Sequence, residues 1–191
     1  MNRINFESDL EQSLKVLHSG GVILYPTDTV WGLGCDATNA AAVEKIFDIK
    51  NRPSSKSLVI LVADEKAILQ YTAAVDLEVF NYLDQQIRPT TVIYNNAIGL
   101  ADNVQAEDGS VAIRICKEEF CKHLIKRFRK PIVSTSANLS GGPAPSIFSE
   151  VSKDIISKVD YTVQYRKDEE TAAIPSQIIR WVNGSVVIIR K

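Results

Sequence analysis

Apolar residues alternate along the chain between a helical spacing and short uninterrupted runs. The helical spacing predicts helices that begin near Ser8, Asn39 and Asp64, and further helices through residues 77–83 and 120–128. Apolar and β-branched runs predict strands at residues 22–25, 58–62, 91–94, 111–115 and 132–133, and a hairpin of 178–182 with 186–189. This alternation is typical of an α/β or α+β fold with a mixed sheet.

Local signals mark where several of these elements begin or turn. Ser8 and Glu11 have the spacing of a capping box, which predicts the start of the first helix. Asn39 is a residue type that commonly caps a helix N-terminus. Asn183-Gly184 tolerates the positive φ of a type I′ turn and therefore predicts the hairpin.

The length and composition fit one folded domain, which we expect to span residues 1–191. Hydrophobic residues make up 45% of the chain, and the formal net charge is −1. A broad nucleic-acid-binding surface is therefore not indicated, and any anion site must be local. No apolar run is long enough to span a membrane and no signal-peptide pattern occurs, so we expect a cytoplasmic protein. Cys35, Cys116 and Cys121 are expected to be free thiols.

Three cations gather where the second predicted helix ends. Lys50, Arg52 and Lys56 lie within seven residues, and Pro53 stops the helix between them. Such cations commonly complement the negative end of a helix dipole, which is one interpretation. The other is a phosphate site, because an arginine fork can bind two phosphate oxygens and neighbouring cations repel one another without an anion.

Hydroxyl and amide groups gather at a second junction, after the strand predicted at 132–133. Ser134, Ser136 and Asn138 precede Gly141-Gly142, where a backbone can approach a ligand closely. An Asx or Ser/Thr turn is the structural alternative. The segment is not a Walker A loop, since no Gly-Lys-Ser/Thr occurs.

A third polar segment follows the strand predicted at 22–25. Thr27, Asp28 and Thr29 are expected to form a tight loop that Gly32 and Gly34 permit. A capped turn is the structural interpretation, and substrate binding by the hydroxyls is the functional one. Asp28 could assist Mg²⁺ or move a proton.

The chain lacks the residue sets of several catalytic classes. It has no His-Asp-Ser set, no pair of histidines at metal-ligand spacing and no clear carboxylate dyad, so no metal ligands are assigned. Chemistry by positioning and charge neutralisation fits best, such as phosphoryl-type transfer from a Mg²⁺-bound nucleotide. The basic run 126–130 favours either a solvated helix end or an RNA patch.

The separated segments together resemble the YrdC-type family. Its Lys-x-Arg and Ser-x-Asn signature is present as Lys50, Arg52, Ser136 and Asn138. The stretches 25–34, 111–114, 134–141 and 175–176 are also similar to family motifs, and the likeness extends from about Gly21 to Arg190. The resemblance implies a single YrdC-like domain with a twisted, mixed parallel and antiparallel sheet, flanking helices and a concave basic cavity.

The resemblance also implies an activity, since the best-understood members of the family are threonylcarbamoyl-AMP synthases. They use ATP with Mg²⁺, L-threonine and bicarbonate, and they release pyrophosphate. Their product serves downstream threonylcarbamoyl-transferase proteins that modify tRNA, and tRNA is itself a possible partner. A related paralogue with another nucleotide-dependent activity, and an RNA-binding or translation-associated module, are the alternatives. The intact Ser136-Ala137-Asn138 favours the synthase.

Site roles follow by position from the same resemblance. The signature residues Lys50, Arg52, Ser136 and Asn138 are expected to be catalytic. ATP binding is expected of Arg52, Lys56, Ser110, Ser136 and Arg190. Threonine binding is expected of Thr27, Thr29, Arg114, Ser134 and Ser176. The chain departs from the family pattern at Trp31, Leu61, Arg88-Pro89-Thr90-Thr91, Cys116 and Gln177.

Overall fold

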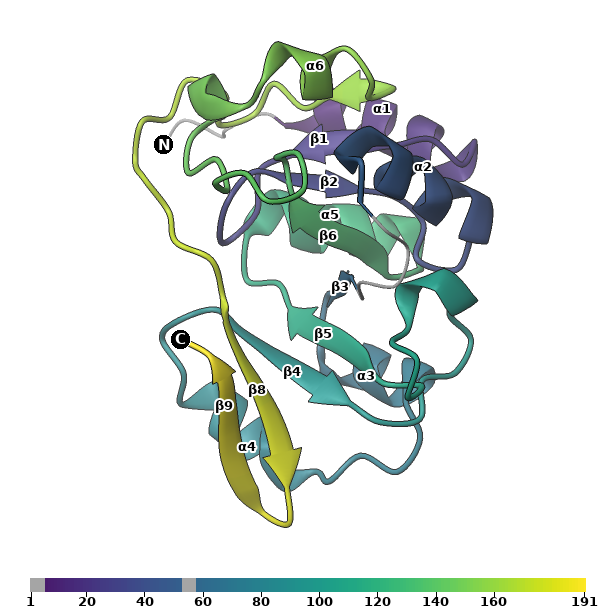
Figure 1. The fold of residues 1–191 in the computed structure, drawn as a ribbon, viewed down its shortest axis with the longest axis vertical. Coiled ribbons are helices and arrows are strands. Elements are labelled where there is room, and N and C mark those ends of the chain that lie inside the picture. Colours follow the sequence, from purple (N-terminus) through teal and green to yellow (C-terminus); the bar gives the residue numbers. More distant parts are fainter. Residues whose placement is uncertain (1–5, 53–57) are drawn as a thin grey trace.

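The computed structural model describes residues 6–52 and 58–191 (Figure 1). Its strands are β1 (Ile23–Tyr25), β2 (Gly32–Gly34), β3 (Val59–Val62), β4 (Thr90–Tyr94), β5 (Val111–Ile115), β6 (Ile132–Ser136), β7 (Tyr161–Thr162), β8 (Gln177–Val182) and β9 (Ser185–Arg190). Within the described residues they form one nine-stranded sheet in the order β7-β1-β2-β6-β3-β5-β4-β8-β9. Three pairs, β1–β7, β3–β5 and β4–β8, are parallel and the others are antiparallel. The predicted mixed sheet is confirmed.

Helices cover both faces of this sheet. They are α1 (Glu7–His18), α2 (Ala40–Lys50), α3 (Glu65–Tyr71), α4 (Glu78–Asp84), α5 (Glu119–Phe128) and α6 (Lys153–Ile156), with 3₁₀ turns at Asp102–Val104 and Phe148–Glu150. Strand residues alternate between two apolar cores: Ile60 faces the core of α2, α3 and α4, whereas Leu61 faces the core of α1 and α5. The predicted flanking helices are therefore confirmed on both faces.

The predicted helix starts near Ser8, Asn39 and Asp64 are confirmed, but the capping box predicted for α1 is wrong. The Asn39 side chain accepts hydrogen bonds from the backbone N–H groups of Ala41 and Ala42, at 3.1 and 3.2 Å. In α1 the cap position is Phe6, whose ring packs against Phe120 and Tyr165, and no side chain caps the helix. Aromatic packing thus fixes the start of α1 in place of a capping box.

The prediction of a tight loop at Gly32 and Gly34 is wrong, because these residues form strand β2. Gly34 lies so close to β1 and β6 that a Cβ atom there would come within 2.6 Å of the Tyr25 ring and 3.0 Å of the Val133 carbonyl oxygen. A missing side chain therefore lets β2 pack between its neighbours. This packing depends on tertiary contacts that a Gly-x-Gly sequence does not reveal.

The C-terminal hairpin and the thiols agree with the sequence predictions. Asn183 and Gly184 have φ angles of 49° and 73°, as a type I′ turn requires. All three cysteines are buried and free. Across the described ranges, the helices are too short or too polar to cross a bilayer.

Candidate active site

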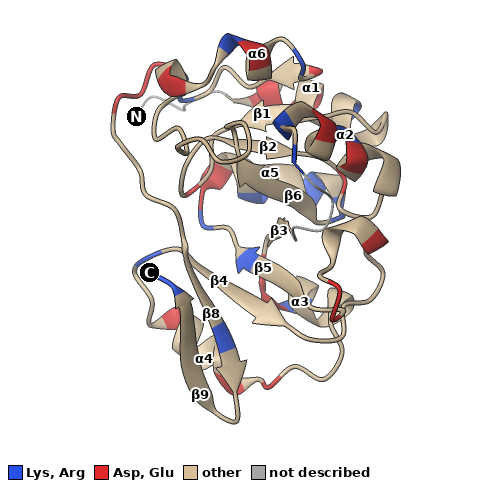
Figure 2. Ribbon diagram, in the orientation of Figure 1, with Lys and Arg blue, Asp and Glu red and all other residues tan. Residues whose placement is uncertain are grey.

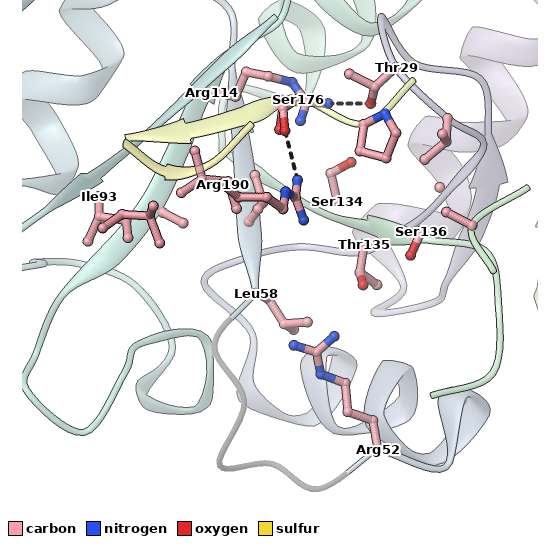
Figure 3. A pocket seen from close by; sticks show the side chains of 18 of the residues that line it. Thr29, Arg52, Leu58, Ile93, Arg114, Ser134, Thr135, Ser136, Ser176 and Arg190 are labelled. Carbon is pink, nitrogen blue, oxygen red and sulfur yellow. Dashed lines mark hydrogen bonds between the residues drawn. The ribbon is translucent and has the colours of Figure 1, made fainter. Parts of the chain in front are cut away.

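A cavity of about 400 Å³ opens where strands β2, β6, β3 and β5 meet the β8–β9 hairpin (Figure 3). Its lining brings together residues that are far apart in the sequence. Eight of the predicted site residues line it: Thr29, Arg52, Ser110, Arg114, Ser134, Ser136, Ser176 and Arg190. The predicted basic cavity is thus present. Lys50, Asn138 and Thr27 lie next to it without lining it, and Lys56 lies outside the described residues.

The cavity has a positively charged lining. Arg52, Arg114 and Arg190 line it, and none of the described lining residues is acidic. Figure 3 shows Arg52 on the opposite side of the cavity from Arg114 and Arg190, and Figure 2 places Lys or Arg positions on β5 and at the end of β9. Burial lowers the pKa of Arg52 and of Arg190, and the neighbouring charge of Arg114 lowers the latter further. An anionic ligand would relieve both effects.

Arg52 reaches the cavity because α2 ends sharply. Asn51 adopts the left-handed conformation with φ 49°, and the Arg52 N–H donates back to the carbonyl of Phe47 at 3.0 Å. This turn directs the chain away from the helix axis. Pro53, the residue predicted to stop this helix, lies outside the described residues.

Arg114 is held in place by a buried ion pair. Its Nη2 lies 3.0 Å from Asp28 Oδ1, and its Nε donates to the same oxygen at 3.1 Å. Nη2 also donates to the Thr29 hydroxyl at 3.2 Å. The side chains of Arg114 and Asp28 are only 5% and 8% exposed. Asp28 thus orients an arginine, and its carboxylate does not line the cavity.

Thr27 shapes the loop that presents Thr29. The Thr27 hydroxyl donates to the Val30 carbonyl at 2.9 Å and accepts from the Thr29 N–H at 3.0 Å. The two threonine hydroxyls lie 2.9 Å apart. Thr27 is buried, so its contribution to the site is indirect.

Lys50 joins the end of α2 to the end of β6. Its side chain is buried, and its Nζ donates to the carbonyl oxygens of Ser136 and of Asn138, the second at 2.7 Å. The Ser140 N–H donates to the Lys50 carbonyl at 2.9 Å. Burial, with the charge of Arg52 as a second cause, lowers the pKa of Lys50 to about 8. Lys50 therefore fixes the position of Ser136 relative to Arg52.

Asn138 stabilises the turn that follows β6. Its side-chain amide donates to the carbonyls of Leu139 and Gly142, at 2.9 and 2.7 Å. The local polar turn predicted as the structural alternative is therefore present at Asn138. Ser134 and Ser136 instead belong to β6 and line the cavity.

The β8–β9 side of the cavity carries its own polar contacts. The Ser176 hydroxyl lies 2.8 Å from the Thr91 hydroxyl, and Arg190 donates to the Ser176 carbonyl at 2.8 Å. Ser110 lies in a turn that Asp108 caps, with 3.0 Å between the Ser110 N–H and the carboxylate. The Ser176 contacts order the hairpin side of the cavity, and the Asp108 contact orders the turn before β5.

The residues of the apolar wall and one further hydroxyl were not predicted. The unpredicted lining residues are Val30, Gly32, Leu58, Val59, Ile93, Ala112, Thr135, Ala144, Pro175, Ile178 and Ile189. Most belong to strands. In a strand, the sequence does not distinguish an apolar residue that lines a cavity from one that packs in the core. Among the described residues, no group of three or more His, Cys, Asp or Glu side chains could hold a metal ion.

Comparisons with known proteins agree over nearly the full length. Residues 15–191 match the Sua5/yciO/yrdC family model, described as "Telomere recombination". A protein named threonylcarbamoyl-AMP synthase from Psychromonas ingrahamii is 36% identical over 183 residues, covering 93% of this chain and 95% of that protein. One of the same name from Idiomarina loihiensis is 33% identical over 171 residues, covering 87% and 90%.

A solved structure supports the same relationship. P. abyssi Sua5 carrying two alanine substitutions has a TM-score of 0.87 and 25% identity to this chain. The match covers 96% of this chain and 56% of that protein, so this chain spans little more than half of its length. The shared fold, the family match and the identities above 30% together establish that the chain belongs to the Sua5/YciO/YrdC family.

Proposed function

We propose that this protein synthesises L-threonylcarbamoyl-AMP from L-threonine, bicarbonate and ATP, with release of pyrophosphate. The observation that carries this proposal is the single cavity in which three arginines, a set of hydroxyls and an apolar wall face one another. Such a cavity suits a triphosphate beside a small amino acid. Its relatives named threonylcarbamoyl-AMP synthase support the same reaction.

The ATP subsite is assigned to the Arg52 side of the cavity and to Arg190. Arg52 and Arg190 neutralise phosphate charge, Ser110 and Ser136 donate hydrogen bonds, and Leu58 belongs to the apolar wall that can face the base. Because no described lining residue is a carboxylate, Mg²⁺ is proposed to enter with the phosphates of ATP.

The threonine subsite is assigned to Arg114, with Thr29, Ser134 and Ser176 around it. Among the described residues, Asp28 and Thr29 contact Nε and Nη2 of Arg114, so Nη1 remains to bind the substrate carboxylate. The ion pair with Asp28 pre-orients this guanidinium. An apolar wall around one methyl group discriminates threonine from serine by only about 1–3 kcal/mol.

The reaction proposed at this site needs no protein nucleophile. The neutral threonine amine adds to CO₂ formed from bicarbonate, which gives an N-carboxylate, and the amine proton and the hydroxide from bicarbonate leave as water. One oxygen of that carboxylate attacks the α-phosphorus of ATP, the bond to the β-phosphate oxygen breaks, and pyrophosphate leaves. Arg52 and Arg190 stabilise the charge that develops on the phosphate oxygens, and positioning accounts for the remaining catalysis. This makes the protein a nucleotidyltransferase.

Pyrophosphate release tests this proposal. The purified protein would be incubated with ATP, Mg²⁺ and bicarbonate, with and without L-threonine. Release that requires both threonine and bicarbonate is expected. Folded, ATP-binding protein that releases no pyrophosphate would contradict the proposal and favour a divergent paralogue.

The RNA-binding alternative has less support in the described residues. In the basic run 126–130, Arg127 pairs with Glu7, and Lys130 lies 2.6 Å from Asp36. Part of the charge that RNA would need is therefore already neutralised. We propose a cytoplasmic enzyme whose product passes to a threonylcarbamoyl transferase acting on tRNA.

A further inference from the structure

The segment that leads into β8 forms part of the cavity wall. After β7 the chain runs through residues 163–176 without helix or strand, along one side of the molecule (Figure 1). It ends at Pro175 and Ser176, which both line the cavity. Ile174 is 62% exposed and Pro175 is also exposed, so apolar burial does little to fix this end.

Hydrogen bonds hold the wall instead. The Ser176 hydroxyl contacts Thr91, the Ser176 carbonyl accepts from Arg190, and the Gln177 N–H donates to the Pro89 carbonyl at 3.1 Å. Pro175 has no N–H group, so its carbonyl is the only backbone group that it can bond. That carbonyl accepts from Nη2 of Arg88 at 3.0 Å.

Arg88 can affect both the position of the cavity wall and the electrostatic potential in the cavity. Its charge contributes, after burial and Arg114, to the lowered pKa of Arg190. Its Nε is buried and has no hydrogen-bond partner among the described residues. A buried donor without a partner costs free energy, so its presence in a structure calls for an explanation, such as a role in the site. It also belongs to the segment 88–91 that departs from the family pattern.

We propose that Arg88 is a positioning residue for the amino-acid subsite. By holding the Pro175 carbonyl, it sets the distance between Ser176 and Arg114 on the threonine side of the cavity. Arg88 does not line the cavity and touches no reacting group. This inference rests on the proposed function for its kinetic consequence, but its structural consequence can be measured alone.

The test compares Arg88→Ala and Arg88→Lys with the wild type. The control is Arg127→Ala, which removes an exposed arginine on α5 that pairs with Glu7. Hydrogen exchange of a peptide spanning residues 163–177 is measured first. Arg88→Ala is expected to speed exchange at Ser176 and Gln177, and Arg127→Ala is expected to leave it unchanged. Equal exchange in wild type and Arg88→Ala would overturn the proposal whatever the protein catalyses.

Kinetics then test the consequence for the substrate. Arg88→Ala is expected to raise KM for L-threonine about tenfold, as loss of a charge-assisted hydrogen bond allows, and to change KM for ATP by less than about twofold. Arg88→Lys is expected to recover part of the loss, because an ammonium group can still donate to the carbonyl. Faster exchange with an unchanged KM for threonine would refute the positioning role. A wild type without threonine-dependent pyrophosphate release would refute the proposed function, and hydrogen exchange would still decide whether Arg88 holds the wall.

Discussion

The side chain of Lys50 is buried beside the cavity, and its ammonium group is hydrogen-bonded to carbonyl oxygens in place of water. Its ammonium group contacts the backbone of Ser136 and Asn138, and it lies 3.5 Å from the Asn138 side-chain oxygen. A single compact donor with several hydrogens suits this cluster, whereas a planar guanidinium would not fit the same contacts. The lysine of the Lys-x-Arg pattern therefore bonds backbone carbonyls beside the cavity, whereas the arginine lines the cavity itself.

Replacing Lys50 with methionine, which keeps most of the volume, is expected to destabilise the fold. Lys50→Met would leave the Ser136 and Asn138 carbonyls without this donor, at a cost of about 3 kcal/mol in the free energy of unfolding. Urea unfolding of wild type and variant measures the difference. A difference below about 0.5 kcal/mol would mean that solvent satisfies these carbonyls.

The stability of the wild type should also depend on pH through Lys50. Its pKa is lowered to about 8 by burial, whereas an unfolded lysine titrates near about 10.4. Between these values the unfolded chain binds more protons, so the free energy of unfolding rises with pH. Relative to Lys50→Met, the wild type should gain about 1 kcal/mol between about pH 8 and about pH 9. Urea unfolding at both pH values measures this, and a flat difference would indicate an ordinary lysine pKa.

Arg52 is expected to matter for catalysis far more than for folding. Arg52→Ala should lower kcat for ATP-dependent pyrophosphate release by about 10²–10³-fold, as for loss of a donor that stabilises transition-state charge. Cooperative unfolding should persist, because the residue lies beyond the end of α2. Arg127→Ala is the matched control and should keep full activity. Equal kcat in Arg52→Ala and wild type would remove Arg52 from the site.

At the scale of single residues, the sequence predicted which residues line the cavity better than it predicted the direction and the partners of their side chains. Arg52, Arg114 and Arg190 match positions in the motifs that the family resemblance identified, and all three line the cavity. The direction of Lys50 and the partnership of Asp28 with Arg114 depend on contacts across the chain, which no local pattern encodes. Arg88 gave no local signal because its partner, Pro175, is distant in the sequence.

Among the elements, β2 depends most on a missing side chain. Gly34→Ala would place a methyl group within 2.6 Å of Tyr25 and 3.0 Å of a β6 carbonyl. We expect a loss of about 2–3 kcal/mol in the free energy of unfolding, as for overpacking of a rigid site. Gly142→Ala is the control, since its nearest neighbour would lie at 3.4 Å. Thermal unfolding compares them, and equal melting temperatures would show that β1 and β6 can separate.

The elements that the sequence predicted have strong signals of their own. Helix α2 has a capping Asn39, β5 has a β-branched run at 111–115, and the β8–β9 hairpin has Asn183-Gly184. Strand β2 and the two-residue β7 lack such signals. Only pairing with neighbouring strands defines them, β2 with β1 and β6, and β7 with β1. Elements that exist only through their neighbours cannot be found from periodicity.

At the scale of the molecule, the cavity exists only when the sheet is complete. Its arginines follow α2 and belong to β5 and β9, which the fold alone brings together. Mg²⁺-ATP at about a hundred times its Kd should therefore stabilise the whole domain by about 2.7 kcal/mol and raise Tm by about 5–10 °C. Arg52→Ala should lose most of this shift. A shift that persists unchanged in Arg52→Ala would place the nucleotide elsewhere.

Because residues of β9 and of the central strands line the same cavity, its structure affects how long the protein survives in a cell. Proteases cleave chains that have opened, and here any opening that frees β9 also removes Arg190 from the cavity. A ligand held by Arg190 would therefore favour the closed edge of the sheet. We therefore expect a cell short of ATP or threonine, the proposed substrates, to expose more of this protein to degradation, so that its abundance would follow the supply of those substrates.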